Sequence, residues 1–570
     1  MLHFGPFFSQ AAEWIHNQTD FALFVQAAAI ILFTLLFLVS IFAEKIKNSG
    51  SLFLLLGLLT ISLFRSFTFY ADSYNPDEGM HLANAIALND DFRPWGSTDF
   101  TTFGPVNAVL ILLTGKILAF FGIKSAFSYF TLRLLNLLIL DVSFILFQKT
   151  LEKNVQPLVS RSVSMLFVIF YGFHFQADCL AFNSEITYLL FITAALYLLC
   201  RMDGGISKRM LFGFGAVCGT MPYIKLQTVP MCAVMLCGGY ARMLCFYRPF
   251  DKTAKKNALR SASMLTAGVL LPTMLVAMAV FPHENGFQDA WFCFIENAKS
   301  HIGNPGAVKY VSQLIRLLEM FSPDALKIGI VVSVALAAYL AYRKHKVSWG
   351  FLFSVLLLLA SSFAAVRSFR LFYHYIHFLV VPVLLFLAIA AQMLADQEEC
   401  FVGIRIKPVL IGLLFFCSIR QFGIYYEEIK TNTVFSSKQV VGESHPNLTQ
   451  AAAFLSEHTS SGDTVVIWGW ESRLYVYANR RSATRQTDIQ RLFAPYSERN
   501  VQMYLADIQS NHPAYLVDVV APGSFAYEEE DKYGLEQYAP VWDAVKDEYV
   551  LVHTMPVEGG SYKFYKRIKD

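Results

Sequence analysis

The sequence is poor in charged residues for its length. Only 16% of its 570 residues are Asp, Glu, Lys or Arg, whereas soluble domains contain about 25%. Hydrophobic residues make up 55% of the chain, and the mean hydropathy is +0.44. This is more apolar surface than a soluble fold of this size needs to bury, so the composition indicates a polytopic membrane protein.

Several sequence motifs are also missing. The nine cysteines show no metal-ligand spacing and none follows Tyr425, which argues against a zinc site or a disulfide framework. Neither Gly-x-x-x-x-Gly-Lys-Ser/Thr nor His-Glu-x-x-His occurs, which argues against an ATP-driven motor and against that class of zinc protease. The glycines of Gly213–Gly219 have the wrong spacing for a dinucleotide loop, and we expect them to allow close helix packing instead.

The charges that are present divide the chain into two parts. From Tyr425 to the end there are 20 acidic and 14 basic residues, a net charge of −6, so the rest of the chain carries +9 of the total of +3. Basic loops stay in the cytoplasm. We therefore predict a membrane domain over residues 1–424 and an extracytoplasmic domain over residues 425–570.

Apolar runs long enough to cross a bilayer, about 20 residues, predict about twelve transmembrane helices. Alternate loops are basic, most strongly between Arg248 and Arg260, which places both termini outside and leaves outer loops at 71–125 and 282–324. We interpret Gly104–Gly122, interrupted by Lys116, as an interfacial helix rather than a span. The predicted spans are Phe21–Ala43 (a retained helix rather than a signal peptide), Leu52–Tyr70, Phe127–Phe147, Val163–Phe175, Ile186–Cys200, Leu211–Ile224, Thr228–Cys245, Met264–Phe281, Ala325–Tyr342, Phe351–Ala365, Phe372–Leu394 and Val409–Phe422.

The acidic C-terminal part has the pattern of a small soluble α/β domain. Short buried strands are predicted at Thr464–Trp468 and Ala514–Val520. They alternate with helices that have turn residues between them. The predicted helices are Leu448–Glu457, Glu471–Ala478 and Val501–Gln509.

One polar stretch in the first outer loop contains the strongest candidates for chemistry. Asn75-Pro76-Asp77-Glu78 has the pattern of a helix start, with Asn as N-cap and Pro in the first turn. Asp77 and Glu78 would then serve the helix dipole. An acid pair at the membrane face could equally deprotonate a hydroxyl or hold a cation, and His81 follows on the same helix face.

Basic residues near the predicted outer ends of spans allow two interpretations. Each one could reach the interface with its long side chain. Together they would form a cationic rim for the phosphate of a lipid at the outer leaflet. Asp141 lies deeper and is expected to be a structural partner. The rim residues are Arg65, Arg133, Lys225, Arg367 and Arg370.

The order of these segments resembles the GT-C superfamily of membrane glycosyltransferases, and most closely its protein O-mannosyltransferase and aminoarabinose transferase (ArnT-like) branch. The resemblance starts from the Pro76-Asp77-Glu78 loop and covers roughly Ser62–Leu394. Its other short motifs are Asn89–Trp95, Phe103-Gly-Pro105, Ser128–Leu138, Asn183-Ser184-Glu185, Met221–Lys225 and the Arg- and Tyr-rich Arg367–Pro382.

The resemblance implies an inverting glycosyltransferase in a bacterial inner membrane. Its donor would be a polyprenyl-phosphate sugar, its acceptor a glycan, lipid or protein, and no nucleic acid is expected as a partner. Asp77 would be the catalytic acid of the pair, with Glu78 assisting. A divalent cation at these two carboxylates is compatible with the chemistry, but no cofactor is required. The donor and acceptor would be bound by residues drawn from His81, Arg93, Lys116, Arg133, Lys225, Arg367, Arg370, His374 and Tyr375.

One position departs from the family. The aminoarabinose branch has Lys-Pro where this chain has Gly104-Pro105, so another base must supply the phosphate contact. Two other functions remain open from the sequence. A transporter or flippase of lipid-linked sugars would place ionisable groups near the bilayer midplane on broken helices in matching halves. A non-catalytic scaffold would need no acid pair.

Overall fold

The computed structural model describes most of the membrane domain and nearly all of the C-terminal domain. The predicted spans Ala325–Tyr342 and Val409–Phe422 and the residue Arg370 lie outside the described residues. Besides a few isolated positions and the two-residue strands β1 (Cys400–Phe401) and β2 (Ile404–Arg405), the described ranges are 31–40, 49–65, 68–69, 73–101, 103–123, 126–173, 176–202, 205–248, 251–299, 307–319, 348–368, 372–395, 445–494 and 496–568.

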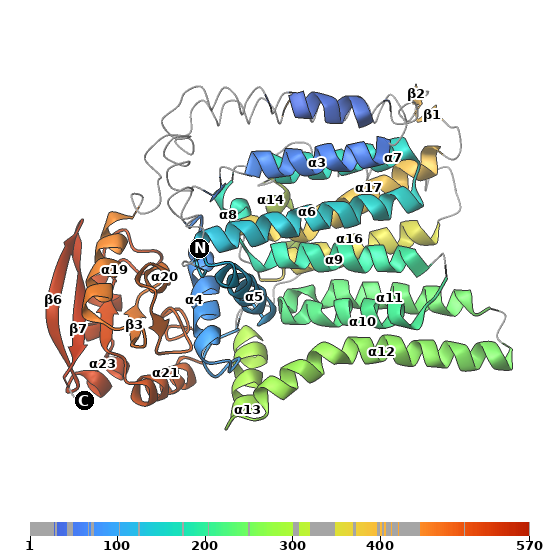
Figure 1. Ribbon diagram of the computed structural model, residues 1–570. Coiled ribbons are helices and arrows are strands. Elements are labelled where there is room, and N and C mark those ends of the chain that lie inside the picture. Colours follow the sequence, from blue (N-terminus) through green and yellow to red (C-terminus); the bar gives the residue numbers. More distant parts are fainter. Residues whose placement is uncertain are drawn as a thin grey trace.

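The membrane domain is a layer of long helices that run side by side (Figure 1). Six described segments are long and apolar enough to cross a membrane, and four further apolar helices are shorter. The chain is thus built as a multi-pass membrane protein, although the described residues do not establish the predicted count of twelve spans. The helices are α3 (Ser49–Arg65), α6 (Tyr129–Asn154), α7 (Pro157–Gly172), α9 (Ser184–Arg201), α10 (Lys208–Thr220), α11 (Val229–Phe246), α12 (Lys252–Val280), α16 (Trp349–Val366) and α17 (His377–Ala395), with Ile31–Ser40 beside them.

Two helices of this layer approach each other through glycines. A Cβ atom placed on Gly215 of α10 would lie 2.2 Å from the Leu265 carbonyl oxygen of α12, and one on Gly268 would lie 2.1 Å from the Phe212 carbonyl oxygen. Any larger residue would force the backbones apart. The prediction of close helix packing at Gly213–Gly219 is therefore confirmed.

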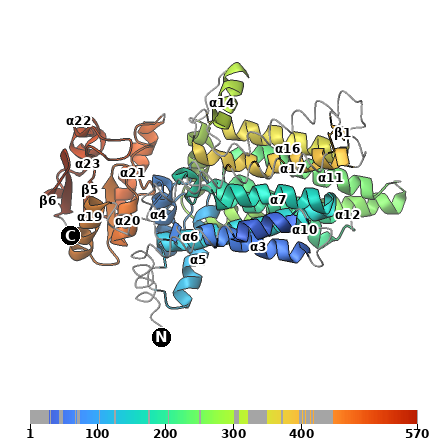
Figure 2. The same cartoon turned by 90° about the horizontal axis from the view of Figure 1, so that it is seen from above.

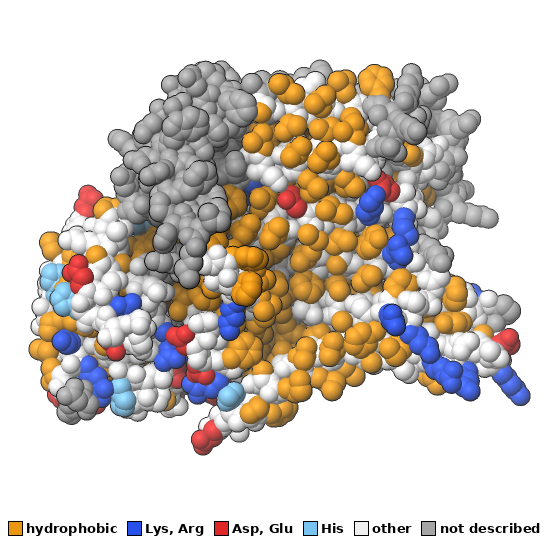
Figure 3. Space-filling view, in the orientation of Figure 1, with side chains coloured by type: hydrophobic (Ala, Val, Ile, Leu, Met, Phe, Trp, Pro, Cys, Tyr) orange, Lys and Arg blue, Asp and Glu red, His pale blue; other side chains and the backbone are white. Residues whose placement is uncertain are grey.

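Basic side chains gather at the end of the helical layer that is farther from the C-terminal domain. Figure 3 shows them beyond a broad apolar belt. The last turn of α9 contains Arg201, α10 begins at Lys208, and α12 begins at Lys252. The alternation of basic loops in the sequence thus corresponds to one end of the molecule.

A second layer lies across the opposite end, between the long helices and the C-terminal domain (Figures 1 and 2). Helix α5, only 15 residues long, corresponds to the interfacial helix predicted over Gly104–Gly122. The layer also contains short turns that follow the long helices. Its elements are α4 (Pro76–Asp90), α5 (Val106–Phe120), α8 (Ala177–Leu180), η3 (Met221–Tyr223), η4 (Leu226–Thr228), α13 (Gly286–Trp291), η5 (Phe292–Asn297), α14 (Ala307–Glu319) and η6 (Tyr373–Ile376).

The C-terminal domain has one five-stranded sheet in the order β4-β3-β5-β7-β6. The parallel strands are β3 (Thr464–Trp468), β4 (Arg481–Ser482) and β5 (Tyr515–Asp518), and β7 (Gly560–Arg567) pairs antiparallel with β5 and with β6 (Tyr549–Val557). The predicted strands and helices are present, but the β6–β7 hairpin was not predicted, although β6 contains the apolar run Tyr549–Val552, much of which is exposed. The helices are α19 (Pro446–His458), α20 (Arg473–Ala478), α21 (Ser497–Asn511), α22 (Glu530–Tyr533), η8 (Leu535–Gln537) and α23 (Ala539–Val545).

This domain is fixed to the outer layer by direct contacts. Gly79 of α4 packs against Arg473, since a Cβ atom at Gly79 would lie 2.8 Å from the Arg473 backbone nitrogen. The Arg485 guanidinium pairs with Asp507 of its own domain at 2.9 Å and with Asp289 of α13 at 2.7 Å. The C-terminal domain therefore contributes directly to the surroundings of α4.

Candidate active site

The start of α4 is capped as the sequence predicts. Asn75 accepts a hydrogen bond from the backbone N–H of Glu78 at 3.2 Å, and Pro76 occupies the first turn. The Asn75 amide also donates to Asp178 at 2.8 Å and to Asn183 at 3.1 Å. The cap thus joins the first outer loop to the turn between α7 and α9, and it fixes where the next two residues point.

The Glu78 side chain points into the protein, and both of its carboxylate oxygens accept hydrogen bonds. Its carboxylate forms an ion pair with Arg133 of α6, and both side chains are at most 1% exposed. It also accepts backbone hydrogen bonds from Tyr74 and Phe182, each at 2.7 Å. A carboxylate with this set of donors holds the loop, α6 and the α7–α9 turn together, and Glu78 is absent from the lining of the neighbouring cavity.

Asp77 points the other way, into a cavity of about 360 Å³ between the membrane domain and the C-terminal domain. Burial raises the pKa of Asp77, while the nearby charges of His374 and Lys225 oppose that rise. Within the described part of the chain its carboxylate makes no hydrogen bond or ion pair. Asp77 is thus available to a ligand, as a base or as a cation ligand, whereas Glu78 is not.

The opposite wall of this cavity is a chain of charged side chains. His374 bonds to Asp178 through Nδ1 at 2.8 Å, and its Nε2 lies 3.9 Å from Glu185. Glu185 in turn pairs with Lys225 at 2.6 Å, and the Lys225 ammonium lies 4.8 Å from the centre of the Tyr375 ring. Burial opposes ionisation of Asp178, but the hydrogen bonds from His374 and Asn75 lower its pKa to about 2. The wall therefore remains ionised and rigid beside Asp77.

The sequence reasoning included His374, Tyr375 and Lys225 but missed Asp178, and it gave Glu185 only as part of a motif. No sequence signal distinguished the two acids. Both lie in the turn predicted between Phe175 and Ile186, and acids are common in solvated turns. The fold brings this turn against the start of α4 through Asn75.

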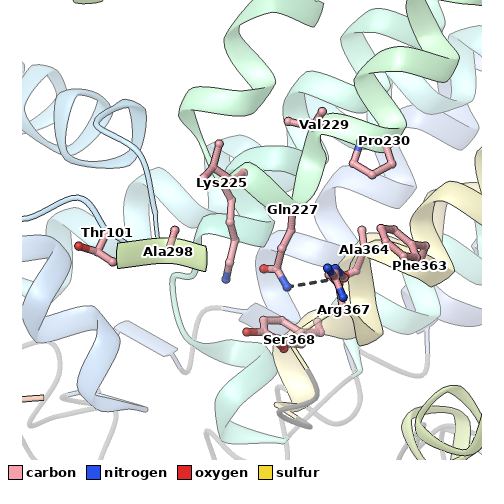
Figure 4. A pocket seen from close by; sticks show the side chains of 12 residues that line it. Thr101, Lys225, Gln227, Val229, Pro230, Ala298, Phe363, Ala364, Arg367 and Ser368 are labelled. Atoms are coloured by element: carbon pink, nitrogen blue, oxygen red, sulfur yellow. Dashed lines mark hydrogen bonds between the residues drawn. The ribbon is translucent and has the colours of Figure 1, made fainter. Parts of the chain in front are cut away.

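A second cavity of about 300 Å³ adjoins the first and is mostly apolar. The two share Lys225, Ser368 and Tyr375, and the second extends between the start of α11 and the end of α16. Figure 4 shows the side chains of Lys225, Gln227 and Arg367 pointing into the same space, with Gln227 donating to the Ala364 carbonyl at 3.2 Å. Lys225 thus stands where the apolar groove meets the cavity of Asp77, and Arg367 lines the groove beside it.

The structure gives the reason for the glycine at position 104. A Cβ atom there would lie 1.9 Å from the Tyr223 carbonyl oxygen, and the Gly104 N–H donates to the Ile224 carbonyl at 2.9 Å. The space that a side chain at position 104 would need is filled by the turn that carries Lys225. In this chain the cation therefore enters the cavity from the end of α10.

The other predicted site residues lie outside the charged wall. Arg93 is exposed and pairs with Asp91, and Lys116 is exposed on α5. Arg133 is buried on Glu78, and Arg65 donates to the Tyr171 carbonyl at 2.7 Å, so neither extends to the interface.

His81 lines the cavity, where burial lowers its pKa to about 3 and keeps it neutral, and its ring lies 4.3 Å from that of Phe103. Asp141 accepts from Ser62 at 3.2 Å, as a structural partner would.

Comparison with known proteins gives structural neighbours only. No family model and no curated protein sequence matches the chain. The structure of ArnT from Cupriavidus metallidurans bound to undecaprenyl phosphate superposes with a TM-score of 0.54 at 9% identity, covering 91% of this chain and 98% of that one. Apo ArnT gives 0.52 at 11% identity, covering 89% and 97%. The Archaeoglobus fulgidus oligosaccharyltransferase gives 0.46 at 12%, covering 92% and 75%. The chain therefore has the fold of the GT-C glycosyltransferases, as its outer loop predicted.

Proposed function

We propose that the protein is an inverting glycosyltransferase that moves a sugar from a polyprenyl phosphate to the hydroxyl of a glycan, lipid or protein. One observation carries the proposal. The unpaired Asp77 carboxylate faces a cavity whose opposite wall supplies Lys225 and His374, and that cavity adjoins an apolar groove. The neighbour ArnT is described with undecaprenyl phosphate bound, which supports a lipid phosphate as the donor's carrier.

The donor would bind with its prenyl chain in the groove between α11 and α16. Its phosphate would lie against Lys225, which lines both cavities, and Arg367, which lines the groove. A guanidinium and an ammonium together stabilise a leaving phosphate without a nucleotide site. Arg370, if it contributes, does so from outside the described residues.

Transfer would proceed in one displacement. The acceptor hydroxyl attacks the anomeric carbon, its proton passes to Asp77, and the bond between that carbon and the phosphate oxygen breaks with its electron pair on the phosphate. The raised pKa of Asp77 makes this carboxylate a stronger base than a solvated one. If the reaction uses a divalent cation, Asp77 would be its ligand and Glu78 would not.

The proposal places the reaction outside the cytoplasm. The basic ends of α9, α10 and α12 lie away from the cavity, and basic ends face the cytoplasm. A reporter fused after Asp570 tests this placement, since a cytoplasmic signal would contradict it.

Sugar transfer from polyprenyl-phosphate sugars by the purified protein tests the reaction. Asp77→Asn should lower the rate about 10²–10⁴-fold. Asp90→Asn, an exposed acid on the same helix, should transfer normally and serves as the matched control. A folded Asp77→Asn protein with the wild-type rate would refute the role of Asp77. Movement of the lipid-linked sugar across vesicles without any transfer would favour the transporter.

A further inference from the structure

A small polar recess opens from the Asp77 cavity at the side of the C-terminal domain. It has a volume of about 20 Å³ and shares Met80, Phe103 and Gln490 with the main cavity. A space of this size holds one or two polar atoms rather than a ring. Its polar lining is Asn84, Asp99, Thr101, Gln486, Thr487, Asp488, Gln490 and Arg491, which come from α4, the loop after it and the loop after β4.

The recess contains buried amides that lack partners. Gln486 is 3% exposed and Asn84 is 2% exposed. Both amide atoms of Gln486 and the Asn84 oxygen have no hydrogen-bond partner among the residues that the structure describes. Unpaired buried polar groups cost free energy, so native structures keep few of them without a reason. A ligand that offers both donors and acceptors would satisfy these amides.

An acidic side chain, Asp488, lies beside these amides in the recess. Asp488 accepts from the Gln490 backbone N–H at 2.8 Å, and burial raises its pKa to about 6. Arg491 faces Asp99 at 3.8 Å. The recess thus offers both hydrogen-bond donors and acceptors, from its amides, a carboxylate and a guanidinium. Such a site suits hydroxyl groups, because a hydroxyl both donates and accepts.

The mouth of the main cavity above the recess is aromatic. Trp470 and Phe525 of the C-terminal domain both line it, with their ring centres 4.8 Å apart and the planes nearly perpendicular. The Trp470 indole N–H is buried and lacks a partner in the described structure. An indole that presents an apolar face and an unused donor suits a ligand with both apolar and hydroxyl-bearing sides.

Helix α4 connects the recess to the proposed base. Asp77, Met80 and Asn84 are spaced by three and four residues and so share one face of the helix. Seven residues of α-helix span about 10 Å. One bound molecule along this face can therefore place one hydroxyl in the recess and another at Asp77, the proposed base.

We propose that the recess is a subsite for a carbohydrate acceptor, in which Gln486, Asn84 and Asp488 bind a hydroxyl-bearing substituent of one sugar ring while Trp470 covers the ring. The C-terminal domain would thus select a glycan, or the sugar part of a glycolipid, over a peptide hydroxyl. The assignment of the bound sugar as the acceptor rests on the proposed transfer, but its binding does not.

Binding is tested first, with the full chain in nanodiscs, because sugar-based detergents would compete. The probes are maltose, cellobiose, lactose, chitobiose and mannobiose, with a Ser- and Thr-containing tripeptide for comparison, and saturation-transfer NMR detects weak complexes. We expect at least one disaccharide to bind the wild-type protein. Gln486→Ala and Asp488→Asn should each weaken that binding about tenfold, the effect of one lost buried hydrogen bond. The exposed residues Gln537 and Asp531 provide matched controls, Gln537→Ala and Asp531→Asn.

The outcomes separate this inference from the proposed function. If no disaccharide binds wild type, if only the peptide binds, or if Gln486→Ala and Asp488→Asn bind as wild type, the subsite is refuted. Where transfer is measured, Gln486→Ala should raise the acceptor KM and leave the donor KM and kcat unchanged. A rise in the donor KM instead would assign the recess to the donor sugar and overturn the inference. Sugar binding without any transfer would refute the proposed function and leave the subsite intact.

Discussion

Substitutions of the two adjacent acids at the start of α4 should have different effects. Because Glu78 forms a buried ion pair with Arg133, its substitution should lower stability, whereas that of Asp77 should lower the transfer rate. In Glu78→Gln the side chain keeps its shape, but its amide NH₂ has only donors around it. These are the Arg133 guanidinium and the backbone N–H groups of Tyr74 and Phe182. Arg133, which is 1% exposed, would remain charged and buried after losing the Glu78 carboxylate that pairs with it.

The size of the loss follows from this burial. Breaking a buried ion pair by removing one partner costs about 3–5 kcal/mol, a large part of the roughly 5–15 kcal/mol that stabilises a folded protein. Removing both charges in Glu78→Gln/Arg133→Met should recover much of it, because no charge is then left buried. A part should remain lost, since Arg133 also donates to the Thr68 carbonyl at 3.1 Å.

Thermal denaturation in nanodiscs, followed with sugar transfer at a low temperature, measures both effects. Glu78→Gln should melt several degrees below wild type and the double variant should melt between them, whereas Asp77→Asn should melt no lower than wild type. Transfer per folded molecule should fall far more in Asp77→Asn than in the double variant. A Glu78→Gln protein that melts like wild type yet transfers no sugar would refute the structural role and make Glu78 a catalytic residue.

Four further predictions concern the cavity and the residues around it. The transfer rate should rise with pH through a pKa above the usual carboxyl range, because the ionised form of Asp77 is the base and burial raises its pKa. A rate that is flat across that range would contradict the base role. Replacing Arg367 with Met should raise the donor KM and leave the melting temperature near that of wild type. Lys225→Met should raise the donor KM and also destabilise, since the buried Glu185 carboxylate loses its ion pair at 2.6 Å and keeps, among the described residues, only the more distant His374 as a charged partner. Gly104→Ala should lower the melting temperature, because the new Cβ would meet the Tyr223 carbonyl at 1.9 Å before any shift, and a wild-type melting curve would refute that packing.

Local sequence signals predicted much of the fold. The cap at Asn75, a helix within Gly104–Gly122 and the glycine contact between α10 and α12 follow from neighbours in the sequence and are confirmed. The strands β3 and β5 and the helices α19, α20 and α21 were likewise predicted from their apolar periods, whereas the two-residue strand β4 was not. The β6–β7 hairpin was not predicted, and its place in the sheet is set by pairing, since β7 pairs with β5 and β6 pairs with β7.

The membership of the site was harder to predict than its location. The sequence pointed to the first outer loop, but it grouped Arg133 with the cations of the cavity because charge and position along a span do not reveal which way a side chain faces. The structure shows Arg133 buried on Glu78, while Asp178 and Glu185 complete the wall beside Lys225. The polar recess at Gln486 could not be predicted, since it forms only where the C-terminal domain meets α4.

Composition, hydropathy and charge by themselves determined that the chain is a multi-pass membrane protein with a separate C-terminal domain, and that its acidic loop begins a helix. These properties depend on transfer from water to lipid and on contacts within one turn, and both are set by residues close together in the sequence. Only the tertiary structure decided that Asp77 faces the cavity and Glu78 faces the core. That choice depends on donors about 55 and 104 positions away, at Arg133 and Phe182, which the fold alone brings together.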